Sequence, residues 1–188
     1  MSSSQRLKAP LLATLLACTA AQAATPWQNE AAAQIPPFAE HLLGTVRQAI
    51  AEGGPTAAVR ACQAVAPQIA SEHSQQAWQL GRTSLKVRNP DNAPDAWERA
   101  VLERFASAAE AGTPVKELRH GEEVDGQYRY MQAIAVGEPC LACHGTAIKT
   151  EVQEAIDQYY PHDQARGYQV GELRGAFTLS RPIAQEAP

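Results

Sequence analysis

The sequence predicts an α+β domain in which a small antiparallel sheet is covered by helices. Segments with helical periodicity and segments with strand alternation follow one another without the regular strand–helix–strand order of a parallel sheet. Hydrophobic residues make up 45% of the 188 residues and charged residues 19%, which is typical of a single globular domain. The formal net charge is −4 and no basic run is present, so nothing indicates nucleic-acid binding.

The first 23 residues have the features of a cleaved secretory signal peptide. Arg6 and Lys8 form a positive start, a short apolar stretch follows, and Ala21-Gln22-Ala23 is a cleavage site of the A-x-A type. The apolar stretch is too short to span a bilayer. Because Leu15-Leu16-Ala17-Cys18 resembles a lipobox, a lipid anchor at Cys18 is the less favoured alternative. We therefore expect a periplasmic protein without a membrane span.

Two helices are expected before the first strand. Residues 24–35 are predicted to form a flexible lead-in because prolines discourage regular structure there. The first helix should begin at Pro36-Pro37 and end at Gly53-Gly54-Pro55. The second should cover residues 56–70, where helical spacing of the apolar residues places Cys62 on the inward face.

A strand and a third helix come next. Residues 81–88 alternate between mostly basic and mostly apolar side chains, which predicts a strand with one basic face. A turn-rich loop then leads into a helix that is capped by Asp95. Glu98 stands at the capping-box position of this helix, and Gly112 ends it.

A β-hairpin is predicted after the third helix. Residues 115–124 and 127–136 are expected to be its strands, joined by Asp125-Gly126, a favoured two-residue turn. Met131 lies on the second strand, on the face opposite to that of Tyr130.

A short helix and a closing strand complete the predicted domain. The helix should cover residues 150–159, with Thr150 and Gln153 at capping-box spacing, and the strand residues 172–182. The predicted boundaries are a signal peptide over 1–23, a lead-in over 24–35, the domain over 36–183 and a tail over 184–188.

The most specific motif in the chain is Cys140-Leu141-Ala142-Cys143-His144. A Cys-x-x-Cys-His string is the attachment signature of c-type haem, in which both thiols bond to the porphyrin and the histidine becomes an axial iron ligand. A redox dithiol would need a strand–helix–strand unit around the motif, and a zinc site would need a second pair of ligands. The sequence offers neither. We therefore predict one covalently bound haem c, which agrees with export.

The motif does not fix the second axial ligand. With Cys140 and Cys143 on the haem and Cys18 in the leader, Cys62 is left alone in an oxidising compartment. It is either a small buried hydrophobe or a thiolate ligand of the iron. Met131 is a less favoured alternative, because a methionine on a strand more often serves in packing.

Other polar residues of the chain give a weaker signal. Arg82, Lys86 and Arg88 either form a solvated face or pair with the haem propionates, to which the guanidinium fork is well suited. The remaining histidines belong to no recognisable motif: His41, His73, His120 and His162.

Five blocks of the sequence occur in an order that is typical of a known family. They are Ala61-Cys62 with Ala66-Pro67, Gly81 to Pro90, Pro94 with Trp97-Glu98, Cys140 to Gly145, and Gly171 to Phe177. Together they resemble the PAS-like single-haem c-type cytochromes, formerly a domain of unknown function, over roughly residues 36–182. The resemblance implies a PAS-like antiparallel sheet with N-terminal helices, and axial ligation by His144 and Cys62.

Two functions are compatible with such a site. Iron with both axial positions filled leaves none for a substrate, so we do not expect an enzyme. An electron carrier needs the haem and a transient redox partner protein. A redox or gas sensor would instead release the Cys62 sulfur and bind NO or CO. We favour the carrier, because the sequence shows no output segment after the leader.

Overall fold

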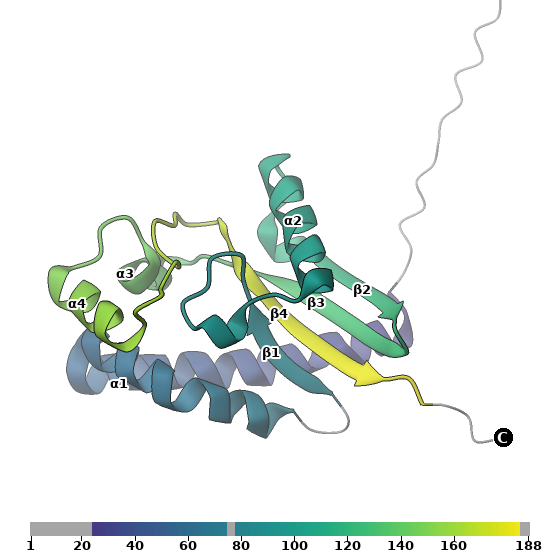
Figure 1. Ribbon diagram of the computed structural model, residues 1–188, viewed down its shortest axis with the longest axis horizontal. Helices are drawn as coiled ribbons and strands as arrows, with labels where there is room; N and C mark the ends of the chain where they lie inside the picture. Colours follow the sequence, from purple (N-terminus) through teal and green to yellow (C-terminus); the bar gives the residue numbers. More distant parts are fainter. Residues whose placement is uncertain (1–23, 75–77, 185–188) are drawn as a thin grey trace, which may run out of the picture.

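The computed structural model describes residues 24–74 and 78–184, and within them one antiparallel sheet of four strands in the order β1-β4-β3-β2. The strands are β1 (Gln79–Thr83), β2 (Arg119–Val124), β3 (Gln127–Ala135) and β4 (Leu173–Pro182). Helix α1 (Pro26–His73) lies along one face of the sheet, and α2 (Ala96–Glu110) lies on the other (Figure 1). The predicted α+β class is therefore confirmed.

Helix α1 is a helical hairpin. Gly53 and Gly54 have non-helical backbone angles, and Gly54 has a φ of 72° that glycine adopts without strain. They divide α1 into a first arm, residues 26–52, and a second arm, residues 55–73. Figure 1 shows the purple first arm alongside the blue second arm. The predicted break between two helices is thus at the right place.

The predicted flexible lead-in is wrong. The first arm begins at Pro26 and continues through Pro36-Pro37, with Ala31 and Ile35 only 0% and 3% exposed. Both prolines lie on the exposed side of the arm, where water can satisfy the carbonyl groups that they leave without a donor. The buried stripe on the other side holds the helix against the sheet.

The sheet separates two hydrophobic cores. The core under α1 consists of Ala31, Ile35, Phe38, Leu42, Ile69, Trp78, Leu80, Tyr130 and Leu179. The core under α2 consists of Val101, Leu102, Phe105, Val115, Leu118, Met131, Ala133 and Ala176. Met131 is 0% exposed within the α2 core, so it lies on the face of the sheet opposite to α1, the helix that carries Cys62. This position favours a packing role for Met131.

The predicted helix cap at Asp95 and the predicted hairpin turn at Asp125-Gly126 are both confirmed. Asp95 accepts a hydrogen bond from the backbone N–H of Glu98 at 2.8 Å, and the Glu98 carboxylate accepts one from the N–H of Asp95 at 3.0 Å. The hairpin turns at Asp125 and Gly126, which have φ values of 51° and 73°. Positive φ at both positions is typical of the turn that matches strand twist.

Two element boundaries and one helix cap differ from the predictions. Strand β1 ends at Thr83, so the basic residues beyond it leave the sheet. Residues 115–117 form a 3-10 turn rather than the start of a strand. Helix α4 (Thr150–Tyr159) has the predicted bounds, but its N-cap is Lys149, and the Gln153 side chain donates to the carbonyl of Ile148 instead of forming a capping box with Thr150.

Some predictions fall on residues outside the described part of the chain. These are the signal peptide, Cys18 and residues 185–188 of the tail. Among the described helices, none is both long and apolar enough to cross a membrane.

Candidate functional site

The Cys-x-x-Cys-His motif lies on a tight helical turn between β3 and α4. Cys140 ends a 3-10 turn, Glu138–Cys140, and Cys143 and His144 belong to the short helix α3 (Leu141–His144). Cys140 packs with Val136, Ala165 and Tyr168, whereas Cys143 packs on the cluster formed by α4 and Val59 of α1. The motif therefore bridges two packed regions.

The imidazole of His144 is held in one orientation. Its Nδ1 lies 2.7 Å from the carbonyl oxygen of Ala165, so Nδ1–H donates and Nε2 keeps a free lone pair. Burial, and then the charges of Arg88 and Arg174, lower the pKa of His144 to about 3. A neutral ring whose tautomer is fixed by a backbone carbonyl is the usual state of a metal-binding histidine.

Arg88, in the segment that follows β1, holds the backbone of the motif in place through hydrogen bonds. Its Nη2 donates to the Cys143 carbonyl at 2.5 Å and to the Ala165 carbonyl at 3.3 Å. Its Nε pairs with Asp163 at 3.0 Å, and the Asp163 side chain is only 1% exposed. Burial raises the pKa of Asp163, but hydrogen bonds from Arg88 and Arg166 outweigh it and lower the pKa overall. Arg88 thus already has a carboxylate partner within the protein.

The other two predicted cations have different surroundings. Lys86 donates to the Arg166 carbonyl at 2.5 Å, and its ammonium lies 4.4 Å from the centre of the Tyr168 ring. The Arg82 guanidinium has no hydrogen-bond or ion-pair partner among the described residues, although burial lowers its pKa and the Cys62 sulfur lies within electrostatic range. Arg82 is therefore the cation of this group that is available to an anionic ligand.

Arg174, on β4, is a site residue that the sequence predictions missed. Its guanidinium donates to the Ser84 hydroxyl at 3.1 Å and to the Lys86 carbonyl at 3.2 Å, and burial lowers its pKa. The closing strand contains two arginines, Arg174 and Arg181, and its sequence pattern does not distinguish the one at the site.

Cys62 lies on the second arm of α1 and is partly buried. Burial raises the pKa of its thiol, and the charges of Arg82 and Arg88 act in the opposite direction. Burial, with a further contribution from the Cys62 charge, raises the pKa of Tyr160 to about 12. The charge of Cys62 also acts to raise the pKa of Cys143. Cys62 therefore lies within electrostatic range of Cys143 in the motif.

The comparisons with known proteins identify the family. The family model described as Tll0287, of the Tll0287-like type, matches residues 6–182. The chain belongs to the Tll0287-like family. Among solved structures, the crystal structure of the cyanobacterial heme-protein Tll0287 is similar, with a TM-score of 0.61 and 29% sequence identity over 87% of this chain and 100% of that chain. No curated protein sequence matches. The family resemblance recognised in the sequence is confirmed.

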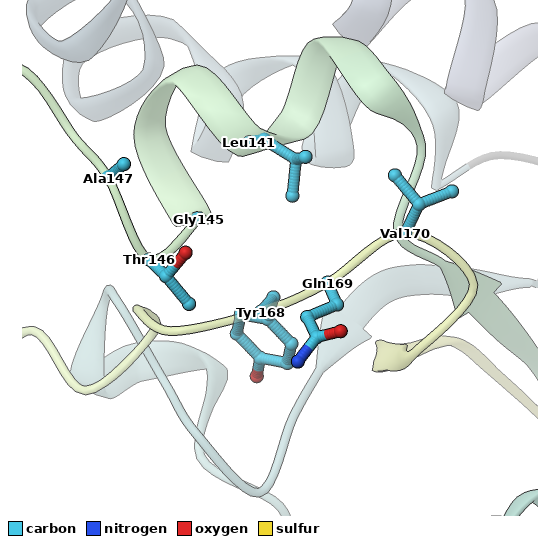
Figure 2. A pocket seen from close by; sticks show the side chains of 7 residues that line it. All are labelled: Leu141, Gly145, Thr146, Ala147, Tyr168, Gln169 and Val170. Carbon is cyan, nitrogen blue, oxygen red and sulfur yellow. The ribbon is translucent and has the colours of Figure 1, made fainter.

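This Tll0287-like chain also has a cavity of about 310 Å³ beside the motif. Figure 2 shows Leu141 pointing from α3 toward a facing loop that carries Tyr168, Gln169 and Val170. The remaining lining residues follow the motif directly: Gly145, Thr146 and Ala147. The volume is at the small end of the range of about 300–1,000 Å³ for ligand sites.

The side chains at the Tll0287-like site differ from those of a metal site in which protein residues supply all the ligands. In the described part of the chain, no three His, Cys, Asp or Glu side chains are grouped closely enough to hold an ion. The site instead combines two motif thiols, one oriented imidazole, a third thiol on another element and several arginines. Such a set suits a group that forms thioethers, takes axial ligands and carries negative charge.

Proposed function

We propose that this chain is a periplasmic haem-binding electron carrier, with one haem c attached through Cys140 and Cys143 and ligated by His144 and Cys62. The hydrogen bond from His144 Nδ1 to the Ala165 carbonyl, 2.7 Å long, carries the proposal. It leaves Nε2 as the free donor atom of the ring, directly after the two thiols of a haem-attachment motif. The similarity to a cyanobacterial heme-protein supports the same cofactor.

The charges around the motif suit a haem. Arg82, Arg88 and Arg174 are gathered near His144 and Cys62, and within this group Asp163 is the carboxylate that pairs with Arg88. The group therefore has an excess of positive charge, which favours the two propionates of a haem. Arg82 is the residue proposed to bind a propionate. Arg88 and Lys86 instead hold the surrounding backbone.

The protein's own groups would tune the cofactor. A bound haem supplies a one-electron iron couple. An anionic Cys62 sulfur on the iron would stabilise the oxidised state and would lower the reduction potential relative to methionine ligation. If His144 and Cys62 both held the iron, no coordination position would be left for substrate turnover. The partner is then a redox protein that makes a small, transient interface.

The covalent attachment is tested by mass spectrometry after export in a cell that matures c-type cytochromes. We expect the denatured chain to keep the added mass of one haem, and the Cys140→Ser/Cys143→Ser variant to lose it. The matched control is Cys62→Ser, which should keep the covalent haem and change the low-spin ferric EPR spectrum. A colourless wild-type protein of unmodified mass would overturn the proposal.

A haem-based sensor is the second candidate. Cys62 belongs to α1, whereas the attachment motif follows β3, so the sulfur can leave the iron without loss of the covalent links. The PAS-like sheet implied by the family resemblance is compatible with this role. Rapid CO binding by the reduced protein, with loss of the sulfur ligand, would favour a sensor. A reduced spectrum that CO does not change would favour the carrier.

A further inference from the structure

Two histidines meet where the two arms of α1 lie side by side, on the helix that also covers the sheet. His41 comes from the first arm and His73 from the last turn of the second. The Nδ1 of His41 lies 3.2 Å from the Nε2 of His73, and the ring centres are 5.4 Å apart at an interplanar angle of 61°. This pair is separate from the Cys-x-x-Cys-His site and has no part in the proposed electron transfer.

The geometry of the pair matches two ligands of one tetrahedral ion. Imidazole nitrogens bound to Zn²⁺ at 2.0–2.1 Å with tetrahedral angles stand about 3.3 Å apart, and the ring centres about 5 Å apart. The nitrogen atoms that face each other across 3.2 Å are therefore already at ligand spacing. Imidazole is also a preferred donor for Zn²⁺, Cu²⁺ and Ni²⁺.

The surroundings hold the His73 ring in place and leave the His41 ring exposed to solvent. His73 is partly buried and its ring packs on Phe38 with centroids 5.6 Å apart, so its direction is set by the core under α1. His41 is exposed, which gives an ion access from solvent and leaves room for water in the remaining coordination positions. We propose that His41 and His73 form a binding site for a divalent transition-metal ion such as Zn²⁺, which ties the two arms of α1 together.

The proton balance of such a site is simple. In the metal-free pair, one of the two facing nitrogens carries the shared hydrogen and the other accepts it. Metal binding requires both lone pairs, so the donating ring shifts its proton to its outer nitrogen and both rings stay neutral.

Calorimetric titration with ZnCl₂ tests the site. The full exported protein is used after chelator treatment, with free thiols alkylated so that cysteine cannot compete for zinc. We expect one equivalent of Zn²⁺ to bind at neutral pH and to raise Tm, because the ion binds only the folded pair. His41→Gln should weaken binding at least 10-fold, and since His41 is exposed this variant should fold normally.

Two further variants make the result decisive. His73→Gln should weaken binding to the same extent as His41→Gln, and His162→Gln, which changes a histidine remote from the pair in sequence, should bind Zn²⁺ as the wild type does. Wild-type protein that binds no zinc, or equal affinity in the wild type and His41→Gln, would overturn the proposal. So would an equal loss of affinity in His162→Gln.

Discussion

The backbone carbonyl of Ala165 connects the motif histidine to Arg88. It accepts hydrogen bonds from His144 Nδ1 at 2.7 Å and from Arg88 Nη2 at 3.3 Å. Asp163 holds this carbonyl in place, because its carboxylate accepts from the N–H of Ala165 at 3.0 Å and pairs with Arg88 at 3.0 Å. Residues 163–165 thus orient the imidazole without touching its free nitrogen.

Removal of the Asp163 charge should destabilise the fold. Asp163→Asn leaves the Arg88 guanidinium without a charge partner. The Arg88 side chain is only 12% exposed, so water cannot fully replace that partner. Loss of one partner of a buried ion pair costs about 3–5 kcal/mol of unfolding free energy, which urea titration can measure. Asp157→Asn is the matched control, because Asp157 pairs with Arg166 from a side chain that is 65% exposed. We expect a change below about 1 kcal/mol there, and equal effects of the two variants would contradict this view of Asp163.

The haem-free protein should lose stability in acid because of His144. Its folded pKa of about 3 is below the ordinary value of 6.5, so between these values the unfolded chain binds more protons. The stabilising effect is complete above pH 6.5 and declines as the pH falls toward 3. From pH 7 to pH 5 the loss should be at most about 2 kcal/mol. Urea unfolding at both pH values should show a smaller difference in His144→Gln, and an unchanged difference would exclude His144 as the cause.

At the scale of the element, α1 is where the sequence prediction and the structure differ most. The prolines of the first arm would cost helix stability in isolation, but Ala31, Ile35 and Phe38 bury one side of the arm in the core under α1. Glu30 adds a hydrogen bond from the Trp78 indole at 2.9 Å and an ion pair with Arg181 at 2.6 Å. Packing against the sheet therefore outweighs local propensity.

Truncation of Ile35 tests whether this segment is part of the core. Ile35→Ala should lower the free energy of unfolding by about 2–5 kcal/mol, the usual cost of such a cavity. Leu43→Ala is the control on the same arm, since Leu43 is 48% exposed, and it should change stability by about 0.5 kcal/mol or less. Equal and small effects in the two variants would restore the view that residues 24–35 are a loose lead-in.

Elements set by local chemistry were predictable from the sequence, and those set by tertiary contacts were not. The Asp95–Glu98 cap and the Asp125-Gly126 turn need only their own neighbours. The end of β1 depends on Ser84, whose hydroxyl donates to the Arg174 carbonyl at 2.7 Å, and on Lys86 and Arg88, which turn toward residues 163–166. Alternation continues through those residues in the sequence, so it could not show where the sheet ends.

The same distinction applies to the candidate site. Fixed spacing identified Cys140, Cys143 and His144, and helical periodicity placed Cys62 on the inward face of its helix. Asp163, Ala165 and Arg174 come from other parts of the chain and meet the motif only through the fold. No short-range pattern could have indicated them.

At the scale of the whole molecule, the site joins regions that are far apart in the chain. Cys62 belongs to the hairpin under the sheet, Arg82 to β1, and the motif to the connection between β3 and α4. The motif is held on one side by the cluster of α4 and α1 and on the other by the cluster around Tyr168. A group attached to the motif and ligated by Cys62 would therefore link α1 to the second half of the chain.

This linkage should make the sulfur ligand a stabilising contact for the whole fold. In the haem-loaded protein we expect Cys62→Ala to lower Tm, because the covalent haem would then be tied to the motif alone. An axial bond that contributes about 2 kcal/mol would correspond to roughly 4–8 °C in a chain of this size. The haem-free protein supplies the control: there Cys62→Ala removes only a partly buried small side chain and should shift Tm much less. Differential scanning calorimetry of the four proteins measures both shifts. If they are equal, Cys62 does not bind the iron, and its role is confined to packing between α1 and the motif.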